Sequence, residues 1–90
     1  MHHYRGKLLQ GSTIRLDPAN VYIDFDSTGA GTASGWMGYI LVGSDKDVVP
    51  GETYALQLVD GRSGELRIDG FASDDSDKVR ALFVGQGPMT

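Results

Sequence analysis

Apolar and polar residues alternate with a period of two along much of this 90-residue chain. This is the period of a β-strand, in which successive side chains point to opposite faces of a sheet. In residues 21–26, "VYIDFD", Val21, Ile23 and Phe25 fall on one face and the polar residues on the other. The same alternation, or a β-branched and aromatic composition, predicts strands at residues 4–10, 13–16, 21–26, 36–43, 52–59, 65–71 and 78–85.

Turn-forming residues separate these segments. "DPAN" at residues 17–20 and the pair Pro50-Gly51 supply turn chemistry, and "STGAGTASG" at residues 27–35 is typical of an exposed loop. Residues 73–84, "SDDSDKVRALFV", begin with good helix caps, but their β-branched and aromatic end favours a strand. The sequence therefore predicts an all-β fold, a small antiparallel barrel or sandwich of five to seven short strands.

Residues 54–68, "YALQLVDGRSGELRI", predict a β-hairpin, and register parity constrains its turn. A two-residue turn on Asp60 and Gly61 would set the apolar face of one strand against the polar face of the other. The faces agree only if the loop has an odd number of residues. We predict a three-residue loop on Arg62, Ser63 and Gly64, or a five-residue loop on residues 60–64, with Gly64 left-handed in both.

Length and charge narrow the class of protein. The chain predicts a single domain over residues 1–90, with residues 1–3 and 86–90 flexible. Its net charge is −4 and its eight basic residues are dispersed, which disfavours binding of nucleic acid through phosphates. The absence of cysteine excludes disulfides and thiolate chemistry. No apolar run suits a signal peptide or a membrane span, so the predicted location is cytoplasmic, with no membrane partner.

The residues that could carry catalysis or bind a metal are few. The histidines are His2 and His3, adjacent to each other and without a third ligand at an obvious spacing. Asp24 and Asp26 share a strand face about 7 Å apart, but a solvated outer face is the simpler interpretation. Residues 24–29, "DFDSTG", begin like a calcium loop, yet the position that requires glutamate is Gly35. We therefore predict no catalytic residue, no cofactor and no metal, and hence no enzyme.

The aromatic residues are the best functional candidates. Trp36 and Tyr39 fall on opposite faces of the strand "WMGYIL", so one of them is expected to be partly exposed, beside Tyr22. The competing interpretation is that Trp36 fills the core and Tyr39 covers a glycine across the sheet. The candidate binding surface is Tyr22, Trp36 and Tyr39, with Arg62 at the hairpin tip.

These residues predict a non-enzymatic binding or interaction module that uses an exposed aromatic face. The expected partner is a protein or peptide, and a second copy of the chain is a further candidate. The alternative is a small barrel that binds nucleic acid through its aromatics with Arg67, Lys78 and Arg80. A small hydrolase comes third, because the chain offers so few catalytic side chains.

Overall fold

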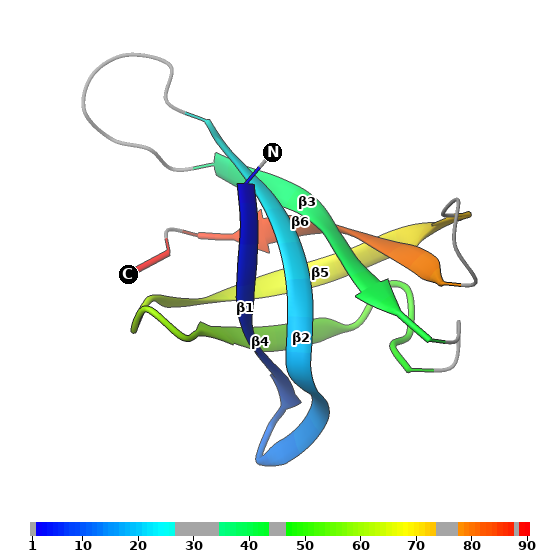
Figure 1. Ribbon diagram of the computed structural model, residues 1–90, viewed down its shortest axis with the longest axis horizontal. Helices are drawn as coiled ribbons and strands as arrows, with labels where there is room; N and C mark the ends of the chain where they lie inside the picture. Colours follow the sequence, from blue (N-terminus) through cyan, green and yellow to red (C-terminus); the bar gives the residue numbers. More distant parts are fainter. Residues whose placement is uncertain (1, 27–34, 44–46, 74–77, 88) are drawn as a thin grey trace.

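The strands of the chain close into a six-stranded antiparallel barrel (Figure 1). The structure is a computed structural model and describes residues 2–26, 35–43, 47–73, 78–87 and 89–90, with no helix among them. The strands are β1 (His2–Gln10), β2 (Thr13–Asp26), β3 (Gly35–Val42), β4 (Thr53–Leu58), β5 (Ser63–Ser73) and β6 (Val79–Gln86). The predicted all-β fold is confirmed, and of the two predicted architectures the barrel is the one formed.

The barrel consists of two three-stranded meanders. Around its wall the order is β1-β2-β3-β6-β5-β4, and β4 pairs back onto β1. The first meander is β1–β2–β3 and the second is β4–β5–β6, and the pairs β1/β4 and β3/β6 join them. Closure pairs most strand edges, which would otherwise present unpaired backbone groups.

The inward-facing side chains of all six strands make one core. On β3 the buried positions are Trp36, Gly38, Ile40 and Val42, and the residues between them face outward, as the alternation predicts. Burying each large aliphatic or aromatic side chain contributes roughly 1.5–3 kcal/mol. The buried apolar residues are Leu8, Ala19, Val21, Ile23, Trp36, Ile40, Val42, Val48, Tyr54, Leu56, Leu58, Leu66, Ile68, Ala81 and Phe83.

Two glycines let neighbouring strands approach closely. A Cβ atom on Gly38 of β3 would overlap the backbone carbonyl oxygen of Tyr22 on β2. A Cβ on Gly6 of β1 would likewise overlap the carbonyl oxygen of Gln57 on β4. Glycine is therefore required where β3 meets β2 and where β1 meets β4.

The turn predicted at residues 17–20 is wrong. β2 runs without interruption from Thr13 to Asp26 and joins two segments that the sequence predicts as separate strands (Figure 1). Asp17 and Pro18 form a β-bulge, because these two residues of β2 lie opposite the single residue Lys7 of β1. The peptide bond between Asp17 and Pro18 is cis. A bulge leaves residues outside the hydrogen-bond ladder, so a strand can continue through a proline, which has no N–H.

The β4–β5 hairpin confirms the predicted parity and corrects the position of the turn. Leu58 N–H donates to the carbonyl of Arg62 at 2.8 Å, which leaves Val59, Asp60 and Gly61 as a three-residue loop. Gly61 takes the positive φ, 100°, that the prediction gives to Gly64. The loop is odd, so the apolar faces match, but it lies three residues earlier than expected.

Gly64 is instead part of β5 and serves the packing of the core. A Cβ atom on Gly64 would come within 2.9 Å of Cζ2 of Trp36, closer than side chains pack. A side chain at this position is therefore disfavoured by the indole ring and not by the backbone conformation.

The chain ends take part in the barrel where the sequence predicts flexible termini. His2 and His3 begin β1, and Gln86 ends β6. Thr90 and Ser63 exchange two backbone hydrogen bonds, at 2.7 and 2.9 Å. The predicted loop at residues 27–35 and the acidic segment at 74–77 lie almost wholly outside the described residues.

Candidate binding surface

The outer face of the first meander and β6 carries a row of side chains in register. Tyr22 on β2 lies directly opposite Tyr39 on β3. On the β1 side Tyr22 is opposite His3, and on the β6 side Tyr39 is opposite Leu82. All four side chains point away from the core, because their neighbours along each strand point inward.

The rings of this row stack on one another. The centroids of Tyr22 and Tyr39 are 4.8 Å apart with the planes 19° from parallel. His3 stacks on Tyr22 with the same centroid separation, 4.8 Å, and an angle of 30°. On the far side of Tyr39, the guanidinium of Arg80 lies 4.6 Å from the ring centre. The result is a continuous column across four strands.

The column decides which parts of the tyrosines a ligand can reach. Tyr22 has His3 on one face and Tyr39 on the other, and Tyr39 lies between Tyr22 and Arg80. Stacking of a nucleobase requires a free ring face. The exposed parts of these partly buried tyrosines are therefore ring edges and hydroxyl groups, which suit apolar contacts and hydrogen bonds.

Two exposed apolar side chains lie beside the tyrosines. Met37, two residues from Tyr39 on the same face of β3, is 56% exposed, and Leu82 is 39% exposed. Adjacent apolar groups at a surface mark contact sites more often than scattered ones. We call Tyr22, Met37, Tyr39 and Leu82 the tyrosine face.

Trp36 does not belong to this surface, and its predicted place in the binding surface is wrong. It is 3% exposed, and its indole N–H donates to the carbonyl of Gly87 at 2.8 Å. The ring meets Phe83 edge-on at 5.7 Å and lies against Gly85, where a Cβ would overlap it. Of the two interpretations of "WMGYIL", Trp36 in the core and Tyr39 outside is the observed one.

Arg62 also lies away from the tyrosine face. Its side chain folds back onto one end of the barrel, with the guanidinium 5.0 Å from the centre of the Tyr4 ring and 5.2 Å from that of Phe25. It forms an ion pair with Asp60 at 2.9 Å, and its backbone N–H donates to the same carboxylate at 3.0 Å. Arg62 therefore has a structural role beside the β4–β5 turn, which its predicted place at the hairpin tip does not reveal.

This ion pair lowers the pKa of Asp60 and raises that of Arg62, as expected for two opposite charges in contact. The hydrogen bond from the Arg62 side chain, followed by that from its backbone N–H, holds the pKa of Asp60 below its ordinary value of 3.8. The hydrogen bonds with Asp60 and then Tyr4 raise the pKa of Arg62. The pair is solvent-exposed, so its effect on stability is small and depends on salt.

The other candidates for chemistry remain apart. His3 is engaged with Tyr22 and with Asn20, whose side-chain oxygen lies 3.1 Å from Nε2. Asp24 is exposed on β2, and the second half of the calcium-like segment 24–29 lies outside the described residues. In the part of the chain that the structure describes, no three His, Asp or Glu side chains gather as metal ligands do. The described residues also include no helix that could cross a membrane.

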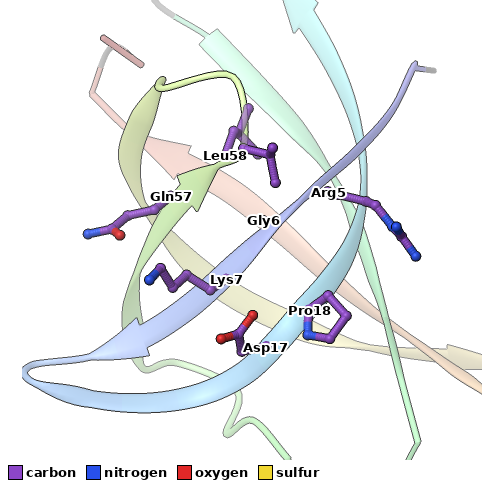
Figure 2. A pocket seen from close by; sticks show the side chains of 8 residues that line it. Arg5, Gly6, Lys7, Asp17, Pro18, Gln57 and Leu58 are labelled. Atoms are coloured by element: carbon purple, nitrogen blue, oxygen red, sulfur yellow. The ribbon is translucent and has the colours of Figure 1, made fainter.

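The surface also has a groove that the sequence does not predict. A groove of about 240 Å³ lies on the outside of the barrel beside Gly6, where β1 passes between β2 and β4 (Figure 2). Its lining residues are Arg5, Gly6, Lys7, Asp17, Pro18, Gln57, Leu58 and Val59. Arg5 and Lys7 alternate along β1, but nothing in the sequence brings Pro18 or Val59 to them.

Comparisons with known proteins add no family to this description: no family model, no curated protein and no solved structure matches the chain.

Proposed function

We propose that this protein is a non-enzymatic binding module that contacts a protein partner through the tyrosine face. The observation that carries the proposal is the pair of stacked rings, Tyr22 and Tyr39, next to the exposed side chains of Met37 and Leu82. Tyrosine is enriched among the residues that dominate binding energy at protein interfaces.

The stacking favours tight contact, because it fixes the tyrosines before a partner arrives. Ordering a side chain at an interface costs about 0.5–1.5 kcal/mol, and a ring already held by its neighbours avoids much of that cost. Met37 is unbranched and adapts its shape to a partner. The tyrosine face thus combines rigid amphipathic groups with one adaptable side chain.

The chemistry of the face suits a partner with an apolar centre and hydrogen-bond acceptors around it. The hydroxyls of Tyr22 and Tyr39 can donate to carbonyl groups at the edge of such a contact. A nucleic acid suits it less well, because the ring faces are covered and the chain has a net charge of −4. Arg67, one of the cations that the nucleic-acid alternative would use, is moreover paired with the carboxylate of Asp69 at 3.4 Å.

The test compares the chain with a Met37→Ser/Leu82→Ser variant. Both proteins serve as bait for affinity capture, and any protein retained by the wild type alone is then produced in pure form and titrated by calorimetry. We expect the variant to bind that protein at least about tenfold more weakly, a loss of about 1.4 kcal/mol. The matched control is Ile14→Ser, since Ile14 is 52% exposed but lies outside the tyrosine face.

Three results would overturn the proposal. The first is that the purified partner binds the wild type and the double variant equally. The second is a concentration-dependent dimer in sedimentation that the double variant abolishes, which would make a second copy of the chain the occupant. The third is binding of a mixed-sequence oligonucleotide at low salt that is lost in the double variant, which would favour a nucleic acid.

A further inference from the structure

Two basic side chains stand out because nothing in the described structure neutralises them. Arg5 and Lys7 form no ion pair and no side-chain hydrogen bond with any described residue. The remaining basic residues that the structure describes, Arg15, Arg62, Arg67, Lys78 and Arg80, all have interaction partners. In a chain whose net charge is −4, two unpaired cations at one place call for a physical explanation.

The two cations flank one point of β1. Arg5 and Lys7 stand on either side of Gly6, which faces inward, so both side chains belong to the outer face. Their Cα atoms are about 6.7 Å apart. Figure 2 shows Lys7 and Gln57 on one side of Gly6 and Arg5 on the other. Gly6 and Leu58 form the floor, where the missing Cβ of Gly6 lets β1 and β4 come together.

The groove extends along β1 beyond Gly6. The groove, with a volume of about 240 Å³, adjoins a second hollow of about 420 Å³. Both are lined by Arg5, Leu58 and Val59. The second hollow reaches His3, Tyr4 and Asp60. Together they follow β1 for about four to five residues, roughly 13–17 Å, which is the length of a short extended peptide.

The charges and apolar groups of the groove favour one kind of occupant. Asp17 is the single carboxylate that lines the first hollow, and Asp60 in the second is already paired with Arg62. Pro18 and Val59 are both exposed, and Val59 is 81% so. The groove therefore offers a net positive charge, from Arg5 and Lys7 against Asp17, between apolar contacts.

We propose that this groove binds an extended acidic peptide segment of a partner protein. Carboxylates on alternate residues of an extended peptide repeat at about 6.7 Å, the same spacing as that of Arg5 and Lys7 along β1. The side chains between them would lie on Pro18 and Val59, and the Gln57 amide can donate to a carboxylate. This inference does not depend on the function of the tyrosine face, which shares no residue with the groove.

A peptide fits better than a polyanion such as single-stranded nucleic acid. Only two free cations lie in the groove, whereas nucleic-acid binding at physiological salt depends on many phosphate contacts. Single-strand binding also relies on bases stacked on open aromatic rings, and the ring faces of Tyr22 and Tyr39 are covered.

The experiment is a titration of the ¹⁵N-labelled full chain, followed by amide chemical shifts at low salt. The probe is a blocked pentapeptide of glutamate alternating with threonine, and its matched control replaces glutamate with glutamine. We expect saturable shifts at Lys7, Gln57 and Val59, with a dissociation constant below about 1 mM that weakens as salt is added.

Variants assign the binding to the groove. Arg5→Gln/Lys7→Gln should weaken binding at least about tenfold, while Asp17→Asn should tighten it about two- to threefold by removing a repulsive charge. Arg15→Gln is the control, since Arg15 is a cation on β2 held by Gln10 at 2.7 Å and lies outside the groove. We expect that variant to bind the probe within twofold of wild type.

The inference is overturned if no saturable shift develops up to about 5 mM probe, or if the glutamine peptide binds equally well. It is overturned as well if the double variant keeps the wild-type affinity. Equal binding of inorganic phosphate would make the site a simple anion site, and tighter binding of an oligothymidylate would make it a nucleic-acid site. Shifts of the same amides on concentrating the protein alone would make a second copy the occupant.

Discussion

Gly85→Ala should damage the barrel through its effect on Trp36. Gly85 lies on β6 against the indole, and an added Cβ would overlap Nε1, Cε2 and Cδ2 of the ring. The indole cannot move aside freely, because it is 3% exposed, meets Phe83 edge-on and donates to Gly87 at 2.8 Å. The substitution therefore forces the ring out of its site or shifts β6.

The expected cost has two parts. Overpacking a core typically costs about 1–3 kcal/mol. Losing the hydrogen bond between Trp36 and Gly87 adds about 0.5–1.5 kcal/mol. A total of about 2–4 kcal/mol lowers the melting temperature of a domain this size by roughly 10–30 °C, at about 4–8 °C per kcal/mol.

Trp36 is the single tryptophan of the chain, so it reports on its own displacement. In the wild type we expect blue-shifted emission and little quenching by iodide. In Gly85→Ala the emission should shift to the red and iodide should quench it, while thermal melting followed by circular dichroism gives the loss of stability. Gly70→Ala on β5 is the matched control, since no atom lies within 4 Å of its added Cβ.

A double-mutant cycle isolates the contact with the indole. In a Trp36→Leu background the alanine at position 85 has no ring to displace, so Gly85→Ala should cost much less there than in the wild type. The reasoning is refuted if Gly85→Ala melts within about 2 °C of the wild type, less than 1 kcal/mol of change, with unaltered emission. Equal costs in the two backgrounds would refute it as well.

Three further substitutions test other parts of the structure. Gly38→Ala places a Cβ on the carbonyl oxygen of Tyr22, a backbone atom that cannot rotate away, so a urea titration should show a loss of about 3 kcal/mol; a loss under about 1 kcal/mol contradicts the close approach. Gly61→Ala should cost about 1–3 kcal/mol because φ is 100°, with Gly61→Asn milder; equal stability of the two variants would count against a left-handed turn. Asp60→Asn tests the ion pair with Arg62: the folded pKa is lowered, so the stabilisation is full above about pH 5 and is lost as pH falls through 3.8 and below. The difference in melting temperature from the wild type should shrink over that range, and a difference that grows in acid would contradict the sign.

The alternation of apolar and polar residues predicts the strands and their faces, because the backbone geometry of a strand alone sets the side to which each side chain points. In β3 it placed Trp36 and Tyr39 on opposite faces. Which face becomes the core was left open, because the answer depends on Gly64 and Gly85, which make room for the indole from strands far along the chain. A sequence pattern shows that a glycine is present but not which ring lies against it.

The turns show the same limit. Parity fixed an odd loop in the β4–β5 hairpin, because mismatched faces would put polar side chains in the core. Its position was wrong because Gly64, which resembles a turn residue, is reserved for packing, and Gly61 takes the positive φ. The turn predicted at Pro18 was wrong for a similar reason, since β2 continues through Pro18 only because of the bulge opposite Lys7.

The candidate site residues show the same difference between what the local pattern predicts and what distant contacts determine. Tyr22 and Tyr39 were predicted together because each faces outward on its own strand. Arg62 was assigned to the same surface although its contacts with Tyr4 and Phe25 hold it elsewhere. The sequence does not distinguish Arg5 from the other dispersed cations, because sequence neighbours say little about which charges are paired in space.

The strand order has a consequence for assembly. Each meander is continuous in sequence, and a single connection, residues 43–52, joins the first to the second. The pairs β1/β4 and β3/β6 can therefore also form between two chains, each giving its first meander to the other's second. Shortening that connection should favour such a domain-swapped dimer, which size-exclusion chromatography would detect. Whether the barrel closes within one chain thus depends on the length of one segment as well as on the core.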